Sequence, residues 1–174
     1  MRYASINKCD VVNGQGIACS LFVQGCAREP HCKGCFNESS WDFNGGQEWT
    51  KEVEDDFIKT CKKEYINSVS IIGGEPMDNA RGVYLLTKRI KEEVNKPIYL
   101  WTSYTYEEIM NADLFKMVFE ETQTNDYRRL IMDNIDCLID GRFIEEQKDL
   151  TLKLRGSSNQ RIWRNNNGTW YLDK

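Results

Sequence analysis

The chain has few prolines, a single histidine and no long apolar run. It holds three prolines in 174 residues, and its charges are interspersed rather than blocked, so nothing marks a linker between domains. This length and pattern predict one domain over residues 1–174. No apolar stretch approaches the ~20 residues that a transmembrane helix needs, and residues 1–8 lack the apolar middle of a secretion signal. We therefore expect a cytoplasmic protein without a membrane segment.

An excess of basic side chains is also absent. The chain has 23 Lys and Arg residues against 27 Asp and Glu residues, which gives a formal net charge of −4. Such a balance offers no electrostatic footprint for nucleic acid or for an anionic membrane. Hydrophobic residues make up 40% of the chain and charged residues 29%, a composition that argues for a globular protein with a core.

Short apolar runs alternate with amphipathic segments along the chain. The apolar runs predict strands at 18–23, 68–72, 97–102 and 135–140, with a long loop over 25–48 and a terminal hairpin around 165–168. A capping box of Thr105 and Glu108 predicts a helix through about Glu120, and two earlier helices follow from the spacing of apolar residues. The expected inward positions are Val53, Phe57, Ile58, Cys61 and Tyr65, then Val83, Leu86, Ile90 and Val94, and finally Ile109, Leu114 and Val118.

This alternation of strands and helices predicts an α/β fold built on a mainly parallel sheet. In such a sheet the functional groups gather at the carboxyl ends of the strands. We expect the site there.

The cysteines are the first candidates for chemistry. There are seven, an odd number, and without an export signal they are more apt to stay reduced or bind metal than to form disulfides. Cys26, Cys32 and Cys35 form a C-x5-C-x2-C motif on the loop after the first predicted strand. Thiolates suit zinc, with His31 or Cys19 as a fourth ligand, or a [4Fe-4S] cluster that three thiolates leave open at one iron. The residues expected in the core instead are Cys9, Cys19, Cys61 and Cys137.

The cysteine motif combines with a glycine motif, Gly-Gly-Glu-Pro at 73–76, which ends the next predicted strand. The combination resembles the radical S-adenosylmethionine superfamily. Within that superfamily, the stretches Asp-Gly-Arg-Phe at 140–143 and Arg-Gly-Ser-Ser-Asn-Gln-Arg at 155–161 are similar to the activating proteins of the anaerobic ribonucleoside-triphosphate reductase. Taken by itself, the segment 155–161 reads equally well as an ordinary polar loop or as a contact to partner or substrate.

The resemblance implies a fold and an activity. The fold is a partial, open β/α barrel of mainly parallel strands. The activity is the reductive cleavage of S-adenosylmethionine by a [4Fe-4S] cluster, which generates a glycyl radical on the reductase. The implied partners are the large subunit of that reductase and a low-potential electron donor such as flavodoxin or ferredoxin.

The resemblance also implies roles for particular residues. Gly73 and Gly74, which lack a Cβ, would let the methionyl group of S-adenosylmethionine approach the backbone closely. The carboxylate of Glu75 would bind the ammonium of that methionyl group. An aromatic ring at Phe36 would lie against the adenine. The implied cluster ligands are Cys26, Cys32 and Cys35, and the implied cofactor-binding residues are Gly34, Cys35, Phe36, Gly73, Gly74, Glu75, Thr102 and Ser103.

The chain departs from the common family pattern at three places. The usual spacing is C-x3-C-x2-C, so two residues are added between Cys26 and Cys32; Ser103 stands where glycine is common, and Lys33 where proline is common. We expect the loop to absorb the two added residues. The alternative functions are an activase of another glycyl-radical enzyme, a radical enzyme acting on a small molecule, and a non-catalytic interaction domain stapled by zinc.

Overall fold

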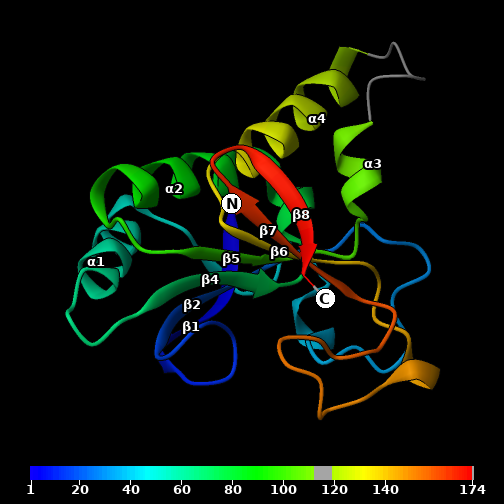
Figure 1. Ribbon diagram of the computed structural model, residues 1–174. Coiled ribbons are helices and arrows are strands. Elements are labelled where there is room, and N and C mark those ends of the chain that lie inside the picture. The colour runs from blue at the N-terminus through cyan, green and yellow to red at the C-terminus, as the bar shows by residue number, and fades with distance from the viewer. Residues whose placement is uncertain (112–118, 174) are drawn as a thin grey trace.

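The computed structural model describes residues 1–111 and 119–173, and the side chains of all of these except 119–125 (Figure 1). Its centre is a sheet of eight strands in the order β3-β1-β2-β4-β5-β6-β7-β8. The strands are β1 Arg2–Asp10, β2 Ala18–Val23, β3 Gln47–Glu48, β4 Ser68–Gly73, β5 Ile98–Trp101, β6 Cys137–Asp140, β7 Arg161–Asn166 and β8 Thr169–Asp173.

The sheet is mixed. Strands β2, β4, β5 and β6 pair in parallel, whereas β1 and β3 at one end and β7 and β8 at the other pair antiparallel. The α/β prediction and the terminal hairpin are confirmed, but a mainly parallel sheet describes only the centre. The sequence did not predict strand β1. Most residues of β1 are exposed or half-buried, so the strand contains no apolar run that would reveal it.

The helices follow their predicted starts more closely than their predicted ends. The α-helices are α1 Lys51–Cys61, α2 Ala80–Glu93, α3 Tyr106–Met110 and α4 Phe119–Met132, and the short 3-10 helices are η1 Glu38–Ser40, η2 Pro76–Asn79 and η3 Glu145–Gln147. Thr50 caps α1 by accepting a hydrogen bond from the Val53 backbone N–H. The capping box of Thr105 and Glu108 opens α3 as predicted.

Two helix predictions are wrong. Helix α3 ends at Met110 instead of continuing to Glu120, and a separate helix, α4, occupies 119–132. Helix α4 has no apolar stripe over most of its length, because polar residues fill its middle, so periodicity does not reveal it. Tyr65 is 49% exposed, because α1 ends at Cys61 before reaching it. The predicted inward positions Leu114 and Val118 lie outside the described residues.

The main core lies between the sheet and the helices. Leu21, Ile71 and Leu100, from three neighbouring strands, pack in one buried cluster with Phe57 of α1 and Leu86 of α2. A second, smaller cluster is formed on β5 and β6 by Tyr99, Cys137 and Ile139, against which Trp101, Leu154 and Ile162 pack. Because residues alternate between the faces of a strand, these two clusters lie on opposite faces of the sheet.

Three of the four cysteines expected in the core are buried there: Cys19, Cys61 and Cys137. Cys9 is exposed, and that prediction is wrong. The pairing of β1 with β2 shifts register between Asn7 and Asp10, and the alternation of buried and exposed residues is lost over this stretch.

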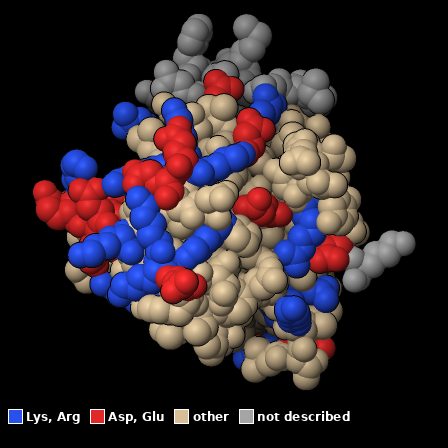
Figure 2. Space-filling model, turned by 60° about the vertical axis from the view of Figure 1, so that its left-hand side comes forward, with Lys and Arg blue, Asp and Glu red and all other residues tan. Residues whose placement is uncertain are grey.

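The surface over α1 and α2 carries both signs of charge in close mixture (Figure 2). Arg89 of α2 joins Glu54 at 2.8 Å, Asp55 at 2.6 Å and Glu93 at 2.8 Å. This network ties the two helices together at the surface. Within the described residues, none of the helices has the length and apolar character needed to span a membrane.

Candidate functional site

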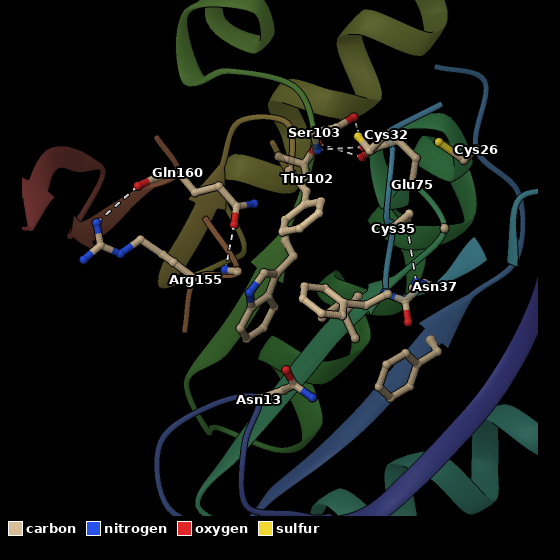
Figure 3. Close-up of a pocket in the computed structure, with 18 of the residues that line it drawn as sticks. Asn13, Cys26, Cys32, Cys35, Asn37, Glu75, Thr102, Ser103, Arg155 and Gln160 are labelled. Atoms are coloured by element: carbon tan, nitrogen blue, oxygen red, sulfur yellow. Dashed lines mark hydrogen bonds between the residues drawn. The ribbon is translucent and has the colours of Figure 1, made fainter. Parts of the chain in front are cut away.

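A cavity of about 400 Å³ opens where the parallel strands end (Figure 3). Figure 3 shows Cys26, Cys32 and Cys35 on one side of it and Arg155 and Gln160 on the other. Most of the predicted cofactor-binding residues line it. They are Cys35, Phe36, Gly73, Gly74, Glu75, Thr102 and Ser103.

The cysteine loop is fixed to the rest of the protein through its backbone. Cys26 follows β2 and its N–H donates to Trp41 O at 3.0 Å, while Cys35 N–H donates to Cys32 O at 3.2 Å. Gly34 adopts a φ of +69°, a left-handed conformation that favours glycine and turns the chain between the last two cysteines. Gly34 is not among the residues that line the cavity, and its predicted part in cofactor binding stays a prediction.

The three thiols are half-buried and free. Burial raises the pKa of Cys26 to about 11. The Cys35 Sγ accepts a hydrogen bond from Asn37 N–H at 3.4 Å. A set of three soft sulfur donors in one wall, shielded in part from water, fits an iron–sulfur cluster.

The zinc alternative requires His31 to join the thiols around one ion. The His31 ring instead stacks on Trp41, with centroids 4.1 Å apart, and its Nε2 lies 3.2 Å from Cys26 O. Among the side chains that the structure describes, no three His, Cys, Asp or Glu residues, the three motif cysteines included, are grouped so as to hold a single metal ion. The geometry thus gives the zinc reading no support.

The glycine pair is required by close packing of the backbone. A Cβ at Gly73, whose φ is +111°, would lie 2.6 Å from the backbone N and O of Val23, and one at Gly74 would lie 2.3 Å from Gly25 O. In addition, Glu75 N–H donates to Gly25 O at 2.7 Å. The pair therefore brings the end of β4 into direct contact with the start of the cysteine loop.

Glu75 joins the ends of two strands inside the cavity wall. Its carboxylate is 2% exposed; Oε1 accepts from Met77 N–H at 3.0 Å and from Thr102 Oγ1 at 2.6 Å. Oε2 accepts from Ser103 N–H at 2.7 Å and from Ser103 Oγ at 2.5 Å. Burial raises the pKa of Glu75, while these hydrogen bonds oppose the rise. Thr102 and Ser103 thus reach the site as partners of Glu75.

Phe36 connects the cysteine loop to the two motifs that lie late in the chain. Its ring is 57% exposed and lies 5.0 Å from that of Phe143, and Lys148 Nζ lies 5.1 Å from its centroid. Gly156 stands beside both rings, since a Cβ there would lie 2.9 Å from Phe36. The segments 140–143 and 155–161 therefore border the site.

Much of the segment 155–161 holds itself in shape. Gln160 Oε1 accepts from the backbone N–H groups of Gly156 and Ser157, and its Nε2 donates to Gly141 O. Arg161 pairs with buried Asp140 at 2.5 Å, which anchors the start of β7 to the end of β6. Because Arg155, Gly156 and Gln160 also line the cavity, the segment is both a structured loop and part of the site wall.

Sequence reasoning missed a further set of cavity residues. Val12 and Leu150 line the cavity although they are 73% and 71% exposed, which places them at its mouth. The signal that was available is a large apolar side chain in an otherwise polar or glycine-rich loop. The missed residues that line the cavity from these two loops are Val12, Asn13, Leu150, Leu152 and Leu154.

An α/β sheet that presents three half-buried thiols and a tight glycine turn at the ends of its parallel strands has the architecture of an iron–sulfur protein. In agreement, residues 12–163 match the family model described as "4Fe-4S single cluster domain". The chain is 40% identical over 169 residues to the anaerobic ribonucleoside-triphosphate reductase-activating protein of Vibrio cholerae, covering 94% of this chain and 98% of that relative.

Proteins of the same name in Escherichia coli K12 and Enterobacteria phage T4 are similar to the chain over comparable lengths. The Escherichia coli protein is 36% identical over 165 residues, which cover 92% of this chain and 96% of that relative. The phage protein is 35% identical over 178 residues, which cover 99% of this chain and 100% of that relative. The chain belongs to the family of anaerobic ribonucleoside-triphosphate reductase-activating proteins.

Proposed function

We propose that this protein activates the anaerobic ribonucleoside-triphosphate reductase by generating a glycyl radical on its large subunit. The observation that carries the proposal is the meeting of three half-buried thiols and the Gly-Gly-Glu turn in one cavity, in a chain whose relatives bear that name. Cys26, Cys32 and Cys35 would hold a [4Fe-4S] cluster. When bound, the cluster supplies the electron for reductive cleavage of S-adenosylmethionine.

The remaining cavity residues would hold S-adenosylmethionine. The Glu75 carboxylate, oriented by four hydrogen bonds, supplies the negative charge that the methionyl ammonium needs. Phe36 offers an exposed aromatic face to the adenine. The apolar side chains of Phe22, Ile72 and Trp101 also line the cavity and would help to exclude water from a reactive intermediate.

The size of the cavity supports a macromolecular substrate. A volume of about 400 Å³ lies at the lower end of the range for a single small ligand and leaves little room for a second small substrate, which supports a reactant that closes the site from outside. A glycine-bearing loop of the reductase is a reactant of this kind.

We propose flavodoxin or ferredoxin as the electron donor. We also propose an open barrel as the finer description of the sheet around this cavity.

A reducing compartment such as the cytoplasm is proposed as the place of action. Seven free cysteines support it, because an oxidising compartment favours disulfides.

The decisive experiment is anaerobic reconstitution followed by turnover. We expect about four iron and four sulfide per chain, 5′-deoxyadenosine when dithionite and S-adenosylmethionine are added, and a glycyl-radical EPR signal when the reductase is present. A second glycyl-radical enzyme offered in competition should remain unmodified. Protein that binds stoichiometric zinc and cleaves no S-adenosylmethionine would contradict the proposal.

A further inference from the structure

We infer that Arg28 is a positioning residue, which together with Ser103 clamps the enlarged cysteine loop against the buried carboxylate of Glu75. Arg28 lies between the first two cysteines of the motif, in the interval that is two residues longer than the common spacing. Its predicted effect on S-adenosylmethionine rests on the proposed function; the clamp itself rests on geometry alone.

Arg28 reaches from the cysteine loop to the residue after Thr102. Its Nε donates to Ser103 Oγ at 3.0 Å and its Nη2 donates to Ser103 O at 3.1 Å. The same Nη2 lies 3.2 Å from Glu108 Oε2, and the Arg28 side chain is 19% exposed. One guanidinium therefore contacts both the side chain and the backbone of Ser103. These two contacts fix the orientation of Arg28 relative to Ser103.

Neighbouring contacts hold the guanidinium and the loop backbone in place. The Arg28 Cζ lies 3.5 Å from the centroid of the Tyr104 ring, within cation–π range. The Tyr104 hydroxyl donates to Asp78 Oδ1 at 2.7 Å, and Asp78 Oδ2 accepts from Ala27 N–H, also at 2.7 Å. The segment next to Cys26 is thus anchored twice, through its backbone by Asp78 and through its side chain by Arg28.

The contacts form a directed chain of hydrogen bonds. The Arg28 Nε donates to Ser103 Oγ, and Ser103 Oγ donates in turn to Glu75 Oε2 at 2.5 Å. A positive donor polarises the hydroxyl and strengthens the bond that the hydroxyl makes to the carboxylate. Glycine at 103 would offer no hydroxyl, and a loop lacking Arg28 would offer no cation. Two departures from the family pattern therefore meet in one contact, which links the loop of the proposed cluster ligands to Glu75.

The other half of the loop is anchored independently. The Arg142 guanidinium donates to Pro30 O, and His31 stacks on Trp41. Removing the Arg28 side chain should therefore loosen the contact with Ser103 and Glu75 without releasing the whole loop.

The test compares Arg28→Ala, Ser103→Gly and the double variant, with Glu108→Gln as matched control. Glu108→Gln removes the ion pair of Arg28 but leaves its bonds to Ser103, and glutamine also serves in a capping box. The first readout is hydrogen exchange of residues 26–34 in the cluster-free protein. We expect Arg28→Ala to speed it about tenfold, as loss of a charged hydrogen bond predicts, and Glu108→Gln to leave it unchanged.

The second readout is the affinity of the reconstituted protein for S-adenosylmethionine, followed by the change in the cluster EPR spectrum. We expect Arg28→Ala to lower this affinity about tenfold and to leave the iron content unchanged. The double variant should bind S-adenosylmethionine no more weakly than the weaker of the two single variants, because Arg28 and Ser103 act as one unit. Arg28→Lys, which keeps the charge but not the fork of donors, should fall between wild type and Arg28→Ala.

The clamp would be overturned if the affinity losses of the two single variants multiplied in the double variant. It would also be overturned if the single variants matched wild type in both readouts. Equal loss of iron and affinity in Arg28→Ala would also overturn it, because the residue would then serve only to fold the loop. Should the wild type fail to cleave S-adenosylmethionine, the proposed function fails, and hydrogen exchange of the cluster-free protein still decides the clamp.

Discussion

At the scale of single residues, the surroundings of a side chain separate groups of identical chemistry. Cys26, Cys32 and Cys35 are half-buried in a cavity wall, whereas Cys19 and Cys61 are fully enclosed in the main core. A thiol enclosed by apolar side chains behaves as a small hydrophobic residue. The sequence predicted core positions for Cys19, Cys61 and Cys137, which are buried, and also for Cys9, whose exposure depends on a register shift that local sequence does not encode.

Substituting the cysteines one at a time should separate the proposed cluster ligands from the cysteines of the core. Cys26→Ala, Cys32→Ala and Cys35→Ala are each expected to abolish cluster-dependent activity and to lower bound iron after anaerobic reconstitution. Cys61→Ala should retain iron and lose on the order of 1 kcal/mol of unfolding free energy, measured by urea titration. If Cys61→Ala lost as much iron as the other three, the assignment of ligands would be wrong.

Asp10 gives a prediction for the dependence of stability on pH. It is 3% exposed, and its carboxylate accepts from the backbone N–H groups of Val12 and Asn13 and from Asn13 Nδ2. Burial opposes ionisation, but these hydrogen bonds outweigh it and lower the pKa of Asp10. A carboxyl whose pKa is lowered on folding stabilises the protein above its unfolded pKa, and that stabilisation fades as the pH falls through about 4 and below.

Asp10→Asn should therefore cost about 1–3 kcal/mol at pH 7 and progressively less toward pH 3. Urea unfolding of both proteins across this range measures the difference. A gap between wild type and variant that stayed constant with pH would show that Asp10 contributes no titrating charge to stability.

At the scale of elements, the site depends on the joint between β2 and β4. These strands pair in register from Ala18 with Ser68 to Val23 with Gly73, and the cysteine loop leaves β2 where the Gly-Gly-Glu turn leaves β4. Strand periodicity predicted both strands but not their adjacency, because a parallel pairing is invisible in either strand alone.

Gly74→Ala tests this joint. The new Cβ would lie 2.3 Å from Gly25 O and 2.8 Å from Ser40 O, both backbone atoms that cannot step aside. We expect a loss of several kcal/mol of unfolding free energy, as overpacking at a rigid contact produces, together with weaker iron binding.

Gly168→Ala is the control for this substitution. Gly168 has a φ of +87° and open space around its Cβ position, so alanine there adds only backbone strain of about 1–2 kcal/mol. Equal destabilisation by the two variants would mean that crowding at Gly74 is unimportant.

At the scale of the whole molecule, one sheet runs from the first strand of the chain to the last. The hairpin of β7 and β8 joins β6, and Tyr106 of α3 stacks on Trp163 of β7 with centroids 4.4 Å apart. We propose on this basis that residues 1–174 form a single domain.

A single domain should unfold in one step. We expect the transitions in far-UV circular dichroism and in tryptophan fluorescence to coincide in urea. The five tryptophans, at 41, 49, 101, 163 and 170, report on distant parts of the chain. Two separated transitions would show that the chain contains independently folding units.

What the sequence determined by itself is local. The cysteine spacing, the glycine turn, the capping box and the terminal hairpin each depend on residues close in the chain, where backbone geometry and hydrogen bonding leave few alternatives. Tertiary structure alone decided which of these features meet. Arg28 contacts Ser103 across 75 residues, and Phe36 and Phe143 lie in contact because strand order brings both of their loops to the cavity. Contacts of this kind follow from the order and register of paired strands, which are selected by burial over the whole chain.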